Sequence, residues 1–291
     1  MTPARLLRPL AEHDHPAVLA LVDADRVPGQ PAATGERLSE ALAGRSPVDS
    51  GWWDELDALH HDVAVDDDGH VLGVIASGWR ARDTTTVILW CHAGEDTATL
   101  LDLIEHALAR HPDSDAEAFS FATALGLGLE ALPVRHRGAT DAALHKAGFT
   151  GADTWAYMRR DLAQPAPQPG RAGCTPITVG ESSDLDGWQV DATGPDGDRI
   201  GQALLARPVD GISVLFWIEV EPSQRGTGLG RRLLDAATDL ARTHAATEVI
   251  LYVDDDDPGS ARDRTAATAL YRSSGFDLVD RLHSYVRPRT R

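Results

Sequence analysis

The sequence predicts an α/β protein that contains two copies of one fold in tandem. Asp68–Gly73 resembles Asp196–Gly201, and both segments are typical of a hairpin turn that enters a strand. Further along the chain, Leu144–Phe149 resembles Tyr271–Phe276. The glycines of these segments lie 148 − 73 = 75 positions apart in the first half and 275 − 201 = 74 in the second. Such near-equal spacing between matching segments indicates an internal repeat.

The length of the chain agrees with two domains. Its 291 residues suit two hydrophobic cores better than one. Pro and Gly gather in Gln164–Gly173, a composition that predicts a linker. We therefore expect an N-terminal domain over residues 1–162, a linker over 163–173 and a C-terminal domain over 174–291.

Strands and helices are predicted in the same order in both halves. In the first half, the apolar run Thr86–Trp90 predicts a strand, and Leu101–Arg110 predicts a helix. In the second half, the apolar, β-prone run Val214–Val220 predicts a strand, and Arg231–Leu240 predicts a helix. A further strand is predicted over Glu248–Val253.

A glycine-rich loop, Arg225–Gly230, connects the strand to the helix in the second half. This order brings free backbone N–H groups and the positive end of a helix dipole to one point, which favours an anion such as a pyrophosphate. Gly226, Gly228 and Gly230 let the backbone approach a ligand without a Cβ in between. The loop lacks the Gly-Lys-Ser/Thr of a Walker loop, and its G-x-G-x-G spacing differs from the G-x-G-x-x-G of a Rossmann fold.

Two motifs of the second half resemble those of a known family. Arg225-Gly-Thr-Gly-Leu-Gly230 fits R-x-x-G-x-G, and Leu270-Tyr-Arg-Ser-Ser-Gly-Phe276 fits L-Y-x-x-x-G-F. With Val-x-Pro just upstream, the first motif resembles the coenzyme A loop of the GCN5-related N-acetyltransferases (the GNAT family), and the second resembles another hallmark of that family. The resemblance implies two tandem GNAT folds, each a mixed, mostly antiparallel sheet flanked by helices. It also implies acetyl-CoA as the co-substrate.

The same resemblance implies roles for particular residues. In the family, the pantetheine arm of the coenzyme pairs with the fourth strand, here Ile218–Val220, and the backbone N–H of Val220 is the expected donor to the thioester oxygen. Tyr271 matches the tyrosine that donates to the departing sulfur, and its ordinary pKa of about 10 exceeds the value of about 8.5 for a thiol. The expected coenzyme contacts are Ile218, Val220, Arg225, Gly226, Thr227, Gly228, Leu229 and Gly230.

The motifs leave several candidates for the general base. We predict that Glu219, on the fourth strand beside the expected acyl group, takes the proton of the attacking amine. Strand alternation turns Glu219 to the face opposite Ile218 and Val220. Asp254–Asp257 and His283 are the other candidates.

The first copy departs from the family pattern at both functional positions. Its strand runs into Cys91–Leu100, where a single glycine is followed by Glu95 and Asp96. Two carboxylates at a helix N-terminus suit the helix dipole but repel a pyrophosphate. Leu144 stands at the position of the tyrosine. We predict that the first copy neither catalyses nor binds coenzyme A tightly.

The second copy has a different deficit. A complete GNAT domain has two helices between its first and second strands, and the first copy has room for them at His15–Arg26 and Gly35–Ala43. In the second copy, only Gly180–Gly187 separates a first strand at Thr175–Val179 from a second that begins near Trp188. Its acceptor side is then open or covered by the first domain. Four residues either supply such a cover or pack the first domain: Trp52, Trp53, His60 and His61.

The composition of the chain limits the classes of partner and ligand that can be expected. The formal charge is 27 − 45 = −18, which disfavours nucleic acid and favours a cationic substrate, although acidity alone also serves solubility. Cys91 and Cys174 have no metal-ligand spacing around them, so we expect neither a metal site nor a disulfide framework. No run approaches the ~20 apolar residues of a membrane span. A cytoplasmic protein without a membrane partner is expected.

The sequence therefore predicts an acetyl-CoA-dependent N-acetyltransferase. A degenerate first copy before an active second copy resembles the mycothiol synthase group of the family, which implies a primary amine of a small, cationic or amino-sugar-type acceptor. An antibiotic-modifying enzyme has the same acceptor chemistry. The alternatives are a protein or peptide N-acetyltransferase, which an open acceptor face favours, and a non-catalytic acyl-CoA sensor. The oligomeric state is left open.

Overall fold

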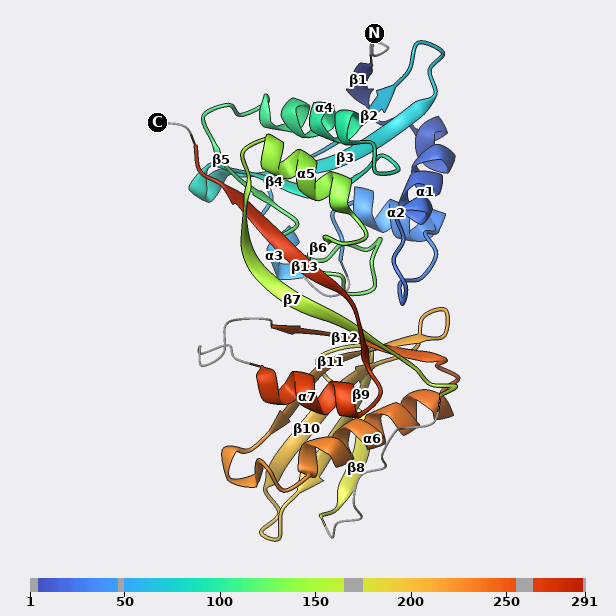
Figure 1. The fold of residues 1–291 in the computed structure, drawn as a ribbon, viewed down its shortest axis with the longest axis vertical. Coiled ribbons are helices and arrows are strands. Elements are labelled where there is room, and N and C mark those ends of the chain that lie inside the picture. Colours follow the sequence, from blue (N-terminus) through green and yellow to red (C-terminus); the bar gives the residue numbers. More distant parts are fainter. Residues whose placement is uncertain (1–4, 47–49, 165–174, 255–263, 290–291) are drawn as a thin grey trace. The chain divides into compact units, whose positions relative to one another are not determined.

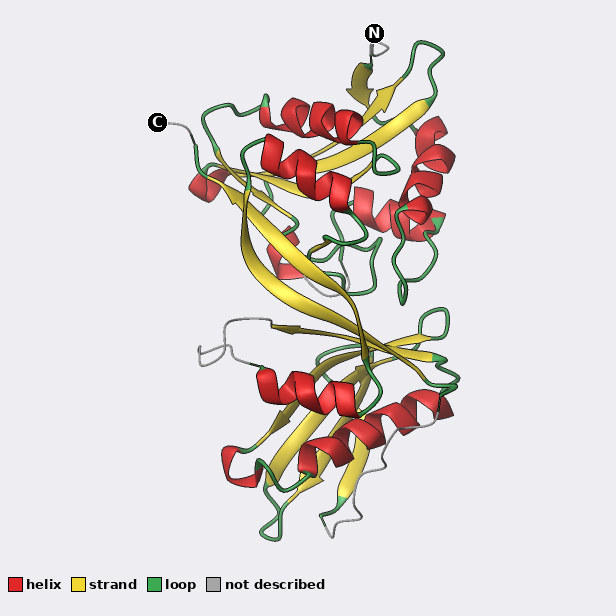
Figure 2. Ribbon diagram, in the orientation of Figure 1, coloured by secondary structure: helices red, strands yellow, loops and turns green. Residues whose placement is uncertain are grey.

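The computed structural model describes residues 5–46, 50–164, 175–254 and 264–289, which fold into two compact units (Figures 1 and 2). The first unit comprises residues 1–154 and 280–291, and the second comprises residues 155–279. Within the residues that the structure describes, no helix is long and apolar enough to cross a membrane. The predicted linker lies largely outside the described residues, as does Cys174.

The first unit is built on a mixed sheet whose strand order is β1-β2-β3-β4-β5-β13, with β6 paired to β13. β4 and β5 run parallel, and the other pairs are antiparallel. The strands are β1 (Leu6–Pro9), β2 (Ala58–Val65), β3 (Val71–Arg80), β4 (Thr85–His92), β5 (Asp115–Ala118), β6 (Leu132–Pro133) and β13 (Asp277–Arg287). The helices are α1 (His15–Ala24), α2 (Gly35–Leu42), α3 (Ser50–Trp53), α4 (Thr97–Leu108) and α5 (Gly138–Lys146), with short 3₁₀ turns at Glu12–Asp14 and Ala81–Asp83.

Helices cover both faces of this sheet, because alternate strand residues are apolar on both sides. Ile75 packs with Leu103 of α4 in one core, whereas its neighbour Val74 packs with Val18 of α1 and Leu38 of α2 in the other. All five side chains are almost completely buried. The two helices predicted for the first copy are thus confirmed, at α1 and α2.

Trp53 has a packing role in the first unit. It is 4% exposed, its indole N–H donates to the carbonyl of Ala122 at 2.9 Å, and its ring contacts Phe121 edge to face. Trp52 beside it is 53% exposed. Of the four residues that sequence reasoning grouped together, Trp53 therefore belongs to the core of its own unit.

The second unit holds a sheet of order β7-β12-β11-β10-β9-β8, in which β11 and β12 run parallel. Only residues 182–186 separate β8 from β9, so the predicted lack of two helices is confirmed. The described helices α6 and α7 both pack on one face, in a single core with the strands. The elements are β7 (Thr150–Asp161), β8 (Ile177–Glu181), β9 (Gly187–Thr193), β10 (Arg199–Ala206), β11 (Ile212–Val220), β12 (Glu248–Asp254), α6 (Leu229–Thr243), α7 (Thr265–Ser273) and a 3₁₀ turn at Pro222–Gln224.

The repeat is visible in matching helix ends. α5 ends at Gly148 with φ +90° and α7 ends at Gly275 with φ +88°. In each case the next residue returns its backbone N–H to the last helical turn, from Phe149 to Leu144 at 3.0 Å and from Phe276 to Tyr271 at 3.1 Å. This cap needs a left-handed residue, which glycine adopts without a Cβ penalty.

The division into units differs from the predicted boundaries at residues 162 and 174. Residues 155–161 of β7 belong to the second unit, where Met158 pairs with Leu251 of β12. Residues 280–287 of β13 belong to the first unit, where Tyr285 pairs with Ala118 of β5. The last strand of each copy therefore pairs in the sheet of the other unit. The sequence does not predict this exchange, because the apolar pattern of a strand specifies a buried face but no particular neighbour.

Candidate functional site

Two parallel strands of the second unit diverge at the predicted acyl site. β11 and β12 pair only from Ile212 to Val214, opposite Glu248 to Ile250, although β11 continues to Val220. The N–H of Glu221 donates back to β10, at Ile200, over 3.0 Å. Since successive residues of a strand alternate in direction, the N–H of Val220 points to the diverging side. The open strand end therefore offers backbone groups to a ligand.

The glycine loop adopts a conformation that suits these glycines. Gly226 and Gly228 have φ of +76° and +89°, and no atom lies within 4 Å of where a Cβ would stand at either position. Gly228 is the N-cap of α6. The loop is held at its start, where Arg225 Nε donates to the carbonyl of Val220 at 3.3 Å, and Thr227 Oγ1 donates to Gln224 at 2.7 Å. The first N–H groups of α6 therefore border an uncrowded loop.

The start of α6 packs against both the strand and the helix of the second motif. At Gly230 a Cβ would lie 3.6 Å from a methyl of Val220 and 3.4 Å from one of Leu270. Leu229 is 3% exposed, and Ile218 and Val220 pack on the same core. The structure thus brings the predicted coenzyme residues together at one end of β11.

Tyr271 lies in this same core. It is 6% exposed, and its ring contacts Phe276 edge to face with centroids 5.9 Å apart. Burial raises the pKa of the phenol to about 12, and Arg264 opposes this shift. The side chain therefore stays a phenol, able to donate a hydrogen bond, throughout the physiological pH range.

Glu219 occupies the opposite face of β11, as the alternation predicted. It is exposed, and the amide of Gln202 donates to it at 2.8 Å. α6 and α7 do not pack on this face, which also carries the half-exposed Trp217. Glu219 is accessible to an acceptor but is separated from Tyr271 by the sheet.

Asp254–Asp257 and His283 were the other candidate bases. Of Asp254–Asp257, only Asp254 is among the described residues, 3.4 Å from the guanidinium of Arg264. His283 pairs with Leu132 of β6 and belongs to the first unit.

β-Bulges establish which positions of the two units correspond. In β4, the register against β3 skips Leu89, and in β11 the register against β10 skips Phe216. The residues that follow, Trp90 and Trp217, are 217 − 90 = 127 positions apart. Two residues beyond these tryptophans, the same offset of 127 aligns His92 with Glu219. The same offset matches Arg137 to Arg264, each at the N-cap of its helix, and Leu144 to Tyr271.

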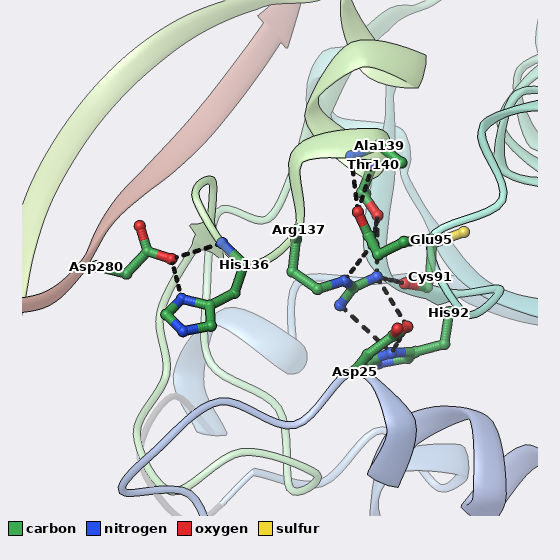
Figure 3. Close-up of polar contacts among 9 residues, drawn as sticks. All are labelled: Asp25, Cys91, His92, Glu95, His136, Arg137, Ala139, Thr140 and Asp280. Atoms are coloured by element: carbon green, nitrogen blue, oxygen red, sulfur yellow. Dashed lines mark hydrogen bonds and ion pairs between the residues drawn. The ribbon is translucent and has the colours of Figure 1, made fainter.

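The first unit fills its own loop with a carboxylate (Figure 3). Glu95 accepts the backbone N–H of Ala139 at 2.7 Å, the hydroxyl of Thr140 at 2.6 Å and Nε of Arg137 at 2.6 Å. These donors belong to the N-terminus of α5, where a carboxylate is favoured by the helix dipole. Asp96 caps α4 in the same way, by accepting the N–H of Thr99 at 2.7 Å.

Three residues that sequence reasoning missed complete this cluster (Figure 3). Arg137 is 4% exposed and donates to the carbonyl of Cys91 at 2.7 Å, while its guanidinium lies 3.2 Å from Asp25. Nδ1 of His92 lies 2.9 Å from the same carboxylate. The repeat could have pointed to His92 and Arg137, since the offset of 127 places them opposite Glu219 and Arg264, but it gives no signal for Asp25, whose helix the second copy lacks.

One group of possible metal ligands lies apart from both sites. Asp66, Asp68 and His70 come within reach of one another at the turn between β2 and β3. Asp66 accepts the backbone N–H groups of Asp68 at 3.0 Å and His70 at 2.8 Å. These hydrogen bonds are typical of an ordinary turn, and the turn explains why the three side chains lie close together.

Comparison with known proteins identifies the family of the second half. Residues 190–276 match the family model described as Acetyltransferase (GNAT) family, and this span holds the glycine loop and Tyr271. This span therefore matches the GNAT acetyltransferase family, as the motifs predicted. The mycothiol acetyltransferase of Beutenbergia cavernae is 36% identical over 92 residues, which are 32% of this chain and 28% of that protein. The chain thus matches less than a third of the length of this curated relative.

Solved structures extend the likeness to nearly the whole chain. A tandem GNAT protein from the clavulanic acid biosynthesis pathway matches with a TM-score of 0.61 and 15% identity, over 97% of this chain and 98% of that one. A GCN5-related N-acetyltransferase from Sphaerobacter thermophilus matches with a TM-score of 0.59 and 15% identity, over 98% and 97%. These matches confirm the predicted tandem GNAT fold.

Proposed function

We propose that the chain is an acetyl-CoA-dependent N-acetyltransferase whose active site lies in the second copy. The observation that carries this proposal is the uncrowded glycine loop at the N-cap of α6, beside a diverging strand end and a buried Tyr271. The pyrophosphate would bind the N–H groups from Arg225 to Gly230. The pantetheine arm would lie along Ile218–Val220, with the N–H of Val220 donating to the thioester oxygen.

The chemistry follows from the residues around that position. The neutral amine attacks the thioester carbonyl, a C–N bond forms, the C–S bond breaks, and coenzyme A leaves as a thiolate. Tyr271 would stabilise the charge on sulfur by a hydrogen bond. With a pKa of about 12 the phenol holds its proton more tightly than a thiol of pKa about 8.5, so the thiolate takes its proton from water. Glu219 would receive the amine proton, directly or through one water.

Two features support a small cationic acceptor. The net charge of −18 attracts amines, which are cations before they react. The partial likeness to mycothiol acetyltransferases favours an amino-sugar type of acceptor, and an antibiotic with such an amine is chemically equivalent. The second candidate is a peptide amine, which the uncovered face at Glu219 and Trp217 would admit. A non-catalytic acyl-CoA sensor has no use for the buried phenol.

The test is release of free coenzyme A from acetyl-CoA in the presence of an amino sugar, an aminoglycoside or a peptide with a free N-terminus. The proposal predicts amine-dependent release by the wild-type chain and none by Gly228→Glu, which places a carboxylate where the pyrophosphate would bind. A matched control is Gly94→Glu, an equally open glycine with φ +53° in the loop of the first copy, and it should leave release unchanged. Equal release by Gly228→Glu would refute the assignment.

A further inference from the structure

A cleft opens in the first unit where β4 and β5 diverge. The two strands pair from Thr85 to Ile88, and the cleft begins beyond, against Leu89 and Trp90. It holds roughly 690 Å³ of empty space, including the part open to solvent. Phe119 and Phe121, which follow β5, line the cleft as well. Its walls are therefore largely apolar and aromatic.

One end of the cleft is polar. Asp25, His92 and Arg137 all line it, and they form the cluster of Figure 3. The side chain of Asp25 is 2% exposed, and that of His92 is 12% exposed. Because Nδ1 of His92 lies 2.9 Å from Asp25, Nε2 is the ring nitrogen that remains for a ligand. Within the residues that the structure describes, Nε2 has no hydrogen-bond partner.

The charges of this cluster do not cancel. Asp25 and Glu95 contribute two negative charges, and Arg137 contributes one positive charge, which both carboxylates share at 3.2 and 2.6 Å. Burial lowers the pKa of His92, and the nearby Arg137 lowers it further, so the imidazole is neutral. The lining of the cleft as a whole is also negative, since Asp23, Asp25 and Glu130 outnumber Arg26 and Arg137, and this charge favours a monovalent cation.

The wall beside this cluster suits a cation as well. Trp90 is 3% exposed, and the centroid of its ring lies 6.1 Å from that of His92. Aromatic faces attract ammonium groups more strongly when both are desolvated.

We propose that this cleft binds a small organic ammonium ion with an apolar or aromatic body. The ammonium would donate to Nε2 of His92 and to the carboxylate of Asp25, and the body would lie along Leu89, Phe119 and Phe121. The site is distinct from the proposed coenzyme site, because its residues all belong to the first unit. It does not depend on acetyl transfer by the second copy.

The experiment is isothermal titration of the full chain with 2-phenylethylamine at neutral pH, with 2-phenylethanol as the uncharged analogue. The proposal predicts that the amine binds at least about tenfold more tightly than the alcohol, since charge-assisted hydrogen bonds are stronger than neutral ones. Asp25→Asn should weaken amine binding by about tenfold or more. Leu129→Trp, which enlarges a side chain of the apolar lining, should abolish it.

Circular dichroism shows whether each variant is folded, and Leu129→Trp keeps the proposal testable if Asp25→Asn does not fold. Glu219→Gln separates this cleft from an acceptor site in the second copy. Amine binding that survives Leu129→Trp but is lost in Glu219→Gln would overturn the proposal. Equal affinities of the amine and the alcohol would overturn it too.

Discussion

The two copies differ most at the loop that follows the fourth strand. Leu233 packs under Gly201 in the second copy, as Leu103 packs under Gly73 in the first, so the two leucines occupy matching positions. The segment from the strand to this leucine is longer in the second copy: Glu219 to Leu233 spans 233 − 219 = 14 positions, and His92 to Leu103 spans 103 − 92 = 11. The three additional residues form the glycine-rich turn of the second copy. In the first copy, Asp96 caps α4, the counterpart of α6, and the neighbouring Glu95 binds the start of α5.

This difference shows that a copy can keep the fold while its ligand site changes. Both copies keep the bulge, the parallel strand pair that diverges and the glycine-capped helix. What changes is whether the helix N-termini meet a side chain of the protein or remain open to a ligand. The first copy has exchanged an anion site for an internal carboxylate. It retains a cleft of different character, with Asp25 and His92 at its polar end.

The largest effect should come from removing the phenol in the second copy. Tyr271→Phe is expected to lower kcat by about 10²–10³-fold, because one positioned donor of this kind contributes about that factor. The melting temperature should change little, since the ring still fills its place in the core. Steady-state kinetics and a thermal melt measure both. Leu144→Met, at the matching position of the first copy, should leave kcat unchanged, and an unchanged kcat for Tyr271→Phe would contradict the assigned role.

A second prediction compares the two N-cap arginines. Arg137→Met leaves the buried Asp25 without its cation and should lower the free energy of unfolding by about 3 kcal/mol. Arg264→Met removes a guanidinium that is 40% exposed and lies 3.4 Å from Asp254, so its cost should be below about 1 kcal/mol. Urea denaturation provides the comparison. Equal losses would mean that the two arginines hold their helices in the same way.

A third prediction concerns Glu219. Glu219→Gln should lower the rate at neutral pH by about tenfold to 10²-fold, because the amine then loses its proton acceptor. The deficit should shrink as the pH approaches the pKa of the amine, which then arrives already neutral. Glu221→Gln, the next carboxylate along the chain, is the control. A deficit that stays constant with pH would exclude Glu219 as the base.

The smallest effect is a pH dependence of stability. The pKa of Tyr271 is about 12 in the folded chain, above the value of about 10 expected when unfolded. A raised pKa means that the neutral phenol stabilises the fold below pH ~10 and that this contribution is lost as the pH rises toward ~12. Tyr271→Phe should therefore lose less stability than wild type across that window in urea titrations. Parallel losses would indicate that the phenol is not desolvated.

Much of the fold was predictable because repeated motifs fix it locally. The Gly-Phe helix ends, the glycine loop and the short connection between β8 and β9 are all visible in the sequence. The exchange of β7 and β13 was not, since strand partners are chosen by tertiary contacts. The cluster around Arg137 was not predicted either. Asp25, His92 and Arg137 are distant in the chain, and only the folded sheet brings them together.

One copy alone is proposed to carry the coenzyme site. Isothermal titration of the chain with acetyl-CoA measures this directly as a stoichiometry. One equivalent per chain is expected for wild type and for Gly94→Glu, and none for Gly228→Glu. Two equivalents in wild type, or one equivalent that survives Gly228→Glu, would show that Glu95 and Asp96 do not close the first copy to the coenzyme.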